Sequence, residues 1–201
     1  MEAYLLPVAF AVGFFVLNAR EQRRRVSLLA AHLQNYRIER LMENLTEGYS
    51  RALGETATAR QNQIWALLAN DEAALSGQFG RFAADMAKVP GELVRVSKLG
   101  IAVPFADRLF PGAMFDLRAA LAIHARGLER IVHNAEALPP KQRAFTLSAE
   151  MLLMQHTCHW YCKSKAVASA RLLARHKSSY QQVLAAVSPA TRDAYLSLVG
   201  G

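Results

Sequence analysis

Apolar residues dominate the start of the chain and then recur at helical spacing along most of its length. Residues 3–19 contain no Asp, Glu, Lys or Arg, and a helix of that length would extend roughly 25 Å. Alanine and leucine are the commonest apolar residues, β-branched runs are few, and Gly and Pro fall in clusters. This pattern favours long helices over a sheet, so the sequence predicts an all-α protein.

The first apolar run ends abruptly in positive charge. Glu2 precedes it, and four arginines follow it within six positions: Arg20, Arg23, Arg24 and Arg25. A secretory signal peptide carries its positive charge before the apolar run, so this order disfavours one. We therefore predict a single-pass transmembrane anchor over residues 1–19, with the four arginines at the lipid headgroups. A helix buried in the protein core or inserted into a partner is the alternative.

The arginines also set the expected orientation. Positive residues remain on the cytoplasmic side of a membrane, so the N-terminus would lie outside and residues 20–201 inside. The expected location is a bacterial-type inner membrane, with membrane lipid as one partner. Cys158 and Cys162 cannot build a disulfide framework, and free thiols agree with a reducing compartment.

Residues 20–89 are expected to form long juxtamembrane helices. Ile38, Met42, Leu45 and Tyr49 recur at spacings of four and three, which is a coiled-coil-like seam. This seam could pack within the chain, or it could bind a protein partner or a second copy in a parallel coiled coil. The helical pattern returns after a polar stretch and ends at Pro90–Gly91.

Residues 90–112 are rich in Pro and Gly and predict a crossover between two helical halves. Residues 113–201 then predict a long antiparallel hairpin, because two apolar helical patterns meet at Pro139–Pro140. A short terminal helix should follow, with Ser188 as its N-cap and Pro189 at its first position.

Folding the hairpin at these prolines brings His124 toward Met154 and Cys158. Four side chains there could converge as ligands of a tetrahedral Zn²⁺ site, and they are His124, Cys158, His159 and Cys162. The alternative is a hydrogen-bonded core histidine with cysteines as small apolar residues. No zinc knuckle or haem-attachment motif supports the metal site, and nothing marks a reactive thiolate.

Charge and motifs narrow the function only to a class. The formal net charge is +8, from 24 Lys and Arg against 16 Asp and Glu. No helix-turn-helix pattern or base-reading residues accompany this charge, so nucleic-acid binding is not favoured. The sequence shows no phosphate-binding loop and no paired carboxylates. We therefore expect a non-enzymatic, membrane-tethered adaptor or structural subunit acting through helix-mediated protein contacts. The alternatives are a metal- or redox-dependent helical protein and a basic nucleic-acid binder.

Overall fold

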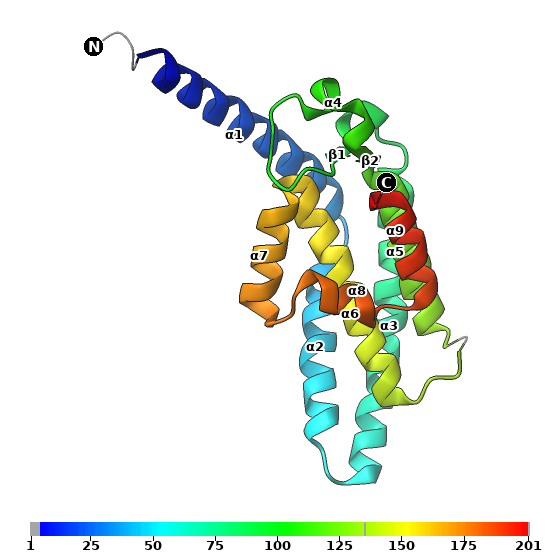
Figure 1. Ribbon diagram of the computed structural model, residues 1–201. Helices are drawn as coiled ribbons and strands as arrows, with labels where there is room; N and C mark the ends of the chain where they lie inside the picture. Colours follow the sequence, from blue (N-terminus) through cyan, green and yellow to red (C-terminus); the bar gives the residue numbers. More distant parts are fainter. Residues whose placement is uncertain (1–4, 135, 201) are drawn as a thin grey trace.

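The computed structural model describes residues 5–134 and 136–200, with side chains from Pro7 onward. Helices make up most of this part of the chain, which confirms the prediction of a helical fold. The helices are α1 (Leu5–Leu33), α2 (Ile38–Gly54), α3 (Thr58–Met86), α4 (Ala106–Leu109), α5 (Leu117–Val132), α6 (Pro140–Cys162), α7 (Lys165–His176), α8 (Tyr180–Ala186) and α9 (Pro189–Val199). Two short strands, β1 (Arg95–Ser97) and β2 (Met114–Asp116), join them (Figure 1).

Helix α6 lies at the centre of the molecule. Helices α5, α7 and α8 pack directly on it, and α1, α2 and β1 contact it as well. Its buried side chains include Leu147, Leu153 and Trp160. Because neighbours cover so much of its circumference, α6 buries residues on nearly every side, which explains why its apolar positions form no narrow stripe.

Helices α2 and α3 form a long antiparallel hairpin below α6 (Figure 1). Leu45 and Ala52 of α2 are fully buried, and Leu68 and Leu75 of α3 are buried as well. The chain turns at residues 34–37, so the apolar pattern that continues past Leu33 belongs to two helices and not to one long one.

Two strands that the sequence did not predict, β1 within the crossover and β2 directly after it, pair with each other. β1 pairs with β2 in antiparallel register, with Val96 opposite Phe115. Trp160 of α6 donates its indole N–H to the carbonyl oxygen of Ser97 at 2.8 Å. Strands of three residues are too short to show a periodic pattern. The pairing nevertheless ties both ends of the crossover to the centre of the fold.

Helix α1 has two halves with different surroundings. Its second half lies against α6 and α3, where Leu29 is buried. Its first half extends away from the rest of the molecule, as Figure 1 shows. The helix is continuous across this change, so its first half is held only by its attachment to the second.

The predicted transmembrane anchor over residues 1–19 is wrong. Within the described residues, no helix is long and apolar enough to cross a membrane. The uncharged part of α1, residues 5–19, spans only about 22 Å at 1.5 Å per residue, against a hydrocarbon core of about 30 Å. Arg20 and Glu21 then continue the same helix. Residues 1–4 of the predicted anchor lie outside the described residues.

The predicted location is corrected together with the anchor. A single-pass orientation in a bacterial-type inner membrane was derived from the apolar run and its arginines, and it is not supported without a spanning helix. Arg25, assigned to lipid headgroups, donates a hydrogen bond to the carbonyl oxygen of Tyr161 at 3.3 Å and pairs with Glu21.

The terminal helix α9 begins as the sequence predicted. The Ser188 hydroxyl accepts a hydrogen bond from the backbone N–H of Thr191, and Pro189 occupies the first turn. Ser188 also donates its hydroxyl to the buried carboxylate of Glu150 at 2.9 Å. This contact attaches α9 to α6 beside Gly127 of α5, where a Cβ atom would lie 2.6 Å from Glu150 Oε2.

We predict that Gly127→Ala destabilises the fold by about 1–3 kcal/mol. Its new Cβ would also lie 2.4 Å from the Thr191 hydroxyl, so the contact between α5, α6 and α9 has to open. Gly80→Ala in α3 is the matched control, because nothing lies within 4 Å of the Cβ it would add. That substitution should be neutral or stabilise by up to about 1 kcal/mol. Chemical denaturation of both variants tests this, and equal effects would contradict it.

Candidate functional site

The first half of α1 exposes apolar side chains on all its sides. We call residues 7–17 the apolar arm. Phe10 is 76% exposed and Phe15 is 73% exposed. At 100° per residue, Val8, Phe10 and Val16 point in directions separated by about 160°, 120° and 80° around the helix axis. No single stripe contains them, so the arm differs from an amphipathic helix that covers a core with one face.

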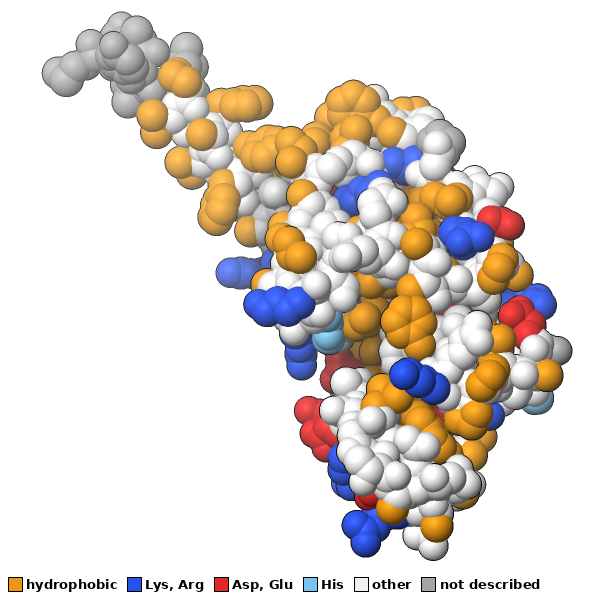
Figure 2. Space-filling model, turned by 60° about the horizontal axis from the view of Figure 1, so that its bottom comes forward, with side chains coloured by type: hydrophobic (Ala, Val, Ile, Leu, Met, Phe, Trp, Pro, Cys, Tyr) orange, Lys and Arg blue, Asp and Glu red, His pale blue; other side chains and the backbone are white. Residues whose placement is uncertain are grey.

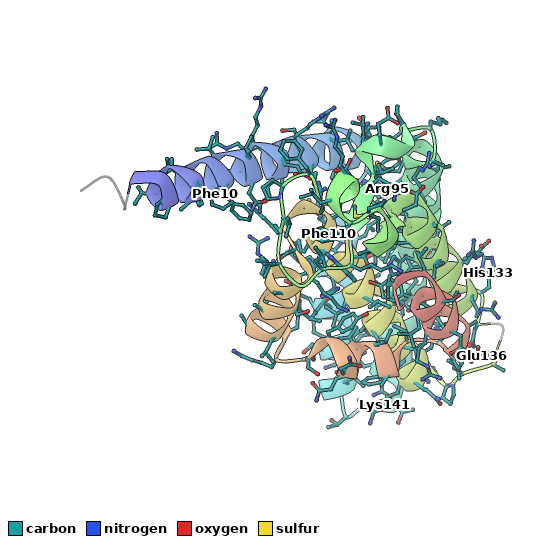
Figure 3. All side chains as sticks on the ribbon, turned by 45° about the horizontal axis from the view of Figure 1, so that its top comes forward. Phe10, Arg95, Phe110, His133, Glu136 and Lys141 are labelled. Atoms are coloured by element: carbon teal, nitrogen blue, oxygen red, sulfur yellow. The ribbon has the colours of Figure 1, made fainter. Side chains whose placement is uncertain are left out.

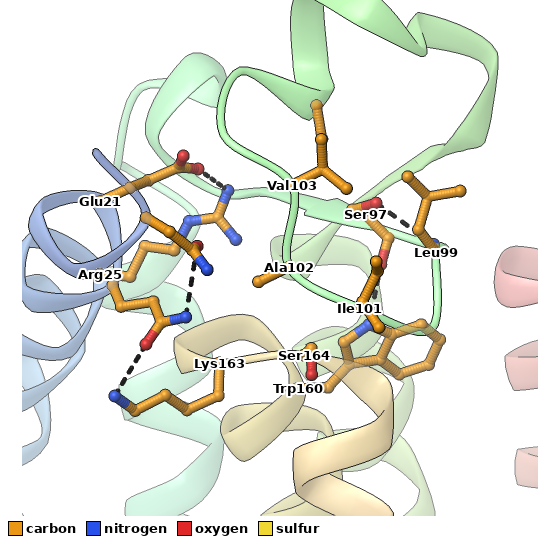
Figure 4. A pocket seen from close by; sticks show the side chains of 13 residues that line it. Glu21, Arg25, Ser97, Leu99, Ile101, Ala102, Val103, Trp160, Lys163 and Ser164 are labelled. Atoms are coloured by element: carbon orange, nitrogen blue, oxygen red, sulfur yellow. Dashed lines mark hydrogen bonds and ion pairs between the residues drawn. The ribbon is translucent and has the colours of Figure 1, made fainter. Parts of the chain in front are cut away.

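A set of polar contacts fixes the direction of α1 where the arm begins (Figure 4). Lys163, at the end of α6, donates to the Gln22 side-chain oxygen at 2.9 Å, and Gln22 donates to Asn18 at 3.3 Å. Arg25 pairs with Glu21 on the preceding turn and donates a hydrogen bond to the carbonyl oxygen of Tyr161. We call these contacts the polar clamp. A cavity of about 20 Å³ beside them is hardly larger than one water molecule, so the junction is closely packed.

A larger cleft of about 360 Å³ separates α1 from the crossover. Its apolar lining comes from both sides, with Leu17 and Leu28 on α1 and Leu93, Pro104 and Phe105 on the crossover. Arg20 and Arg24 line it from α1, and Arg108 lines it from α4. Glu21, Glu92 and Asp107 line the cleft as well, so it combines apolar side chains with charged side chains of both signs at the base of the apolar arm.

Exposed apolar residues of the crossover continue the surface of the arm. Ile101, Phe105, Leu109 and Phe110 are all largely exposed. The space-filling view shows orange side chains along the arm and over the adjoining top of the molecule (Figure 2). Phe10 and Phe110 are labelled on these two parts in Figure 3. This crossover surface could not be predicted from a sequence pattern, because its residues follow no helical period. The cluster of Pro and Gly marks the segment but not its exposed apolar surface.

The arginines after the arm form a basic collar, defined here as Arg20, Arg23 and Arg24. All three side chains are exposed, and none makes an ion pair with another described residue. Arg108 lies nearby over the ring of Phe105, 5.8 Å from its centroid. The charge at the base of the arm is therefore available to an acidic partner.

The four residues predicted to bind a partner lie elsewhere. Ile38, Leu45 and Tyr49 are buried between α2 and α3, and Met42 packs against the same core. The Tyr49 hydroxyl also donates to the buried carboxylate of Glu72 at 2.7 Å. The seam is thus covered within the chain, as the intramolecular interpretation expected.

The predicted zinc ligands are not brought together. Nowhere in residues 5–134 and 136–200 do three His, Cys, Asp or Glu side chains form a group that could hold a metal ion. The His124 ring hydrogen-bonds with its Nε2 to the Thr157 hydroxyl at 2.9 Å. Cys158 and Cys162 are partly buried and free, and His159 lines a cleft between α6 and α7.

The two cysteines have the electrostatics of packing residues. Burial raises the pKa of the Cys158 thiol to about 12 and that of Cys162 to about 11. Both thiols therefore stay protonated at neutral pH, and a protonated thiol is a poor nucleophile and metal ligand. This agrees with their contacts to the apolar core.

His124 belongs to a buried polar chain that links three helices. Its partner Thr157 contacts the Tyr195 hydroxyl at 3.0 Å, which joins α5, α6 and α9. Burial is the main cause that lowers the pKa of His124 to about 3, and His156 adds to it. The imidazole is therefore neutral in the folded protein, where it acts as a hydrogen-bonding core residue.

Comparison with protein-family models, with curated proteins and with solved structures finds no match to this chain.

We predict that acid weakens the fold through His124. The unfolded chain binds a proton near pH 6.5, whereas the folded ring binds one only near pH 3. The free energy of unfolding therefore falls as the pH drops below 6.5, by about 1 kcal/mol between pH 6.5 and 5.5. The His124→Gln variant has no ring to protonate here, so it lacks this pH-dependent loss of stability. The difference in unfolding free energy between wild type and the variant should therefore shrink by about 1 kcal/mol between pH 6.5 and 5.5.

Urea denaturation of wild type and variant at several pH values measures this change. His133→Gln, at an exposed position after α5, controls for the loss of an imidazole in general. A deficit for His124→Gln that stays constant from pH 7.5 to 5.5 would contradict the assignment.

Proposed function

We propose that this protein is an adaptor or structural subunit of a larger assembly and that it acts by inserting its apolar arm into another protein. The partner would present an apolar groove that encloses the arm, with acidic side chains at its rim. The observation that carries this proposal is the exposure of apolar side chains around the whole circumference of residues 7–17.

The energetic argument is the burial of the arm. Phe10, Phe15 and Val12 each remain mostly exposed in the isolated chain. Burying one such side chain contributes about 1.5–3 kcal/mol to the free energy of binding. Side chains on different sides of the helix can all be buried at once only if the partner surrounds the arm. The polar clamp holds α1 at a fixed angle to the body, which reduces the entropy lost when the arm is bound.

A different protein fits this surface better than a second copy of the chain. Two paired helices cover only one stripe of each other, which would leave the opposite side of each arm exposed. A parallel pair would also bring the basic collars together, and like charges at close range repel. An acidic rim on a partner would complement Arg20, Arg23 and Arg24.

The arm can be tested by photo-crosslinking in the cells that make the protein. A photoreactive residue replaces Val8, Phe10 or Val16, one at a time, in the full chain. We expect all three positions to give an adduct with the same protein, because an enclosing groove contacts every side of the arm. Identification of that protein then allows binding to be measured with purified components.

Phe15→Asp should weaken binding to this purified partner by about thirtyfold or more, as expected for an aromatic anchor. Leu67→Asp in α3 is the matched control, because Leu67 is 72% exposed and Phe15 is 73% exposed. Both variants should keep the stability of wild type within about 0.5 kcal/mol. Adducts with a second copy of the chain or with lipid, or equal binding by both variants, would contradict the proposal.

A further inference from the structure

A second cleft lies between α6 and α7, separate from the apolar arm. Its volume is about 410 Å³. Helix α6 contributes Gln155, His156 and His159 to its lining, and α7 contributes the rest. The α7 residues are Arg171, Leu172, Ala174, Arg175 and His176.

No acidic side chain lines this cleft. Arg171 and Arg175 stand one turn apart on α7, both exposed, and neither makes an ion pair with another described residue. Charges of one sign on the walls of a cleft concentrate the potential inside it. The cleft therefore attracts anions.

The histidines add hydrogen-bonding atoms without partners. The His156 side chain is 1% exposed, and its Nε2 lies 3.0 Å from the Ser169 hydroxyl. Its Nδ1 is buried and has no hydrogen-bond partner among the described residues, and the same holds for Nε2 of His176. Buried ring nitrogens without partners are costly. Nδ1 of His124 in the core is another such atom, so what sets His156 and His176 apart is that both line one cationic cleft.

The orientation of His156 is fixed by its neighbours. Its ring stacks on Tyr180 of α8 with centroids 4.7 Å apart. Burial, together with Lys165 and His159, lowers the pKa of His156 to about 4. Burial likewise lowers the pKa of His159, with further lowering by Arg171, Arg175 and His176. The charged side chains that affect these rings, Lys165, Arg171 and Arg175, are thus all cationic, and a bound anion would offset their charge.

The helix macrodipole explains the position of only some of the arginines and histidines that line this cleft. Arg175 and His176 are in the last turn of α7, where cations favour the negative end of the helix. Arg171 lies a turn earlier, and His156 and His159 come from the last two turns of another helix, α6. Their convergence with the arginines needs a different cause.

We infer that this cleft binds a small, water-soluble phosphoryl anion. Two guanidinium groups match the oxygen geometry of a phosphate, and imidazole N–H groups can complete the set of donors. Leu172 and Ala174 are the only apolar residues in the lining, so the cleft offers little surface to an acyl chain. This favours a free phosphate ester over a lipid headgroup.

The test uses the full chain with inorganic phosphate and sulfate as ligands. Titration calorimetry should give a dissociation constant of about 1 mM or tighter for both anions, and acetate should bind at least about tenfold more weakly. In NMR spectra, sulfate should shift the ring resonances of His156 and His159. A purely structural role for these histidines would not produce that shift.

Arg171→Gln combined with Arg175→Gln should weaken phosphate binding at least about tenfold. Arg51→Gln combined with Arg126→Gln removes the same charge from exposed arginines of α2 and α5. This control should change the affinity for phosphate less than about twofold. Thermal unfolding of both double variants checks that the fold is kept.

Three results would overturn the inference. The first is no saturable binding of phosphate by wild type. The second is an equal loss in the two double variants. The third is binding to vesicles that contain phosphatidic acid without binding to free phosphate, which would make a lipid headgroup the ligand.

Discussion

Apolar side chains that occupy every side of a helix have to be enclosed, and two helices of this protein meet that requirement differently. Helix α6 is surrounded by helices of its own chain, with Trp160 and Tyr161 buried near its end. The described first half of α1 is apolar around its circumference, but it extends away from the rest of the molecule. The fold follows from enclosing the first, and the proposed function follows from enclosing the second.

The junction between the end of α6 and the base of the apolar arm is polar. At the end of α6, Lys163 donates to Gln22 of α1, and the carbonyl oxygen of Tyr161 accepts from Arg25. These hydrogen bonds hold the turn of α1 that directly follows the apolar arm. Beyond them the described part of the helix extends away from the rest of the molecule (Figure 1). The basic collar stands at this boundary, which places unpaired charge where an enclosing partner would have its rim.

Buried polar groups determine how the remaining helices meet. Glu150 holds the start of α9 through Ser188, and Thr157 joins His124 to Tyr195. Each of these bonds connects elements far apart in sequence, and each has a partner that only one arrangement of the helices provides. An apolar core alone would tolerate small shifts of α9, whereas these hydrogen bonds fix its position.

Local signals were predicted well from sequence, and properties that depend on neighbours were not. The Ser188 cap is a chemical signal within a few residues, and it is confirmed. Pro140 does begin α6, but α5 already ends at Val132, several residues before the turn that was predicted at Pro139–Pro140. The hairpin geometry placed His124 near Met154 and Cys158, whereas its hydrogen bond goes to Thr157 between them.

The apolar run at the start of the chain was wrongly predicted to be a transmembrane anchor, because apolar side chains around a helix do not by themselves show what covers them. The proposed anion-binding cleft between α6 and α7 does not follow from the sequence pattern, because the chain breaks at Ser164, which caps α7 and brings its arginines beside the histidines of α6. Hydrogen exchange along α1, in purified protein shown by light scattering to be monomeric, tests the central claim most directly. The account predicts that amides of residues 25–33 are protected at least about 100-fold more than those of residues 8–17. Equal protection along the whole helix would contradict it, because the arm would then be covered by its own chain.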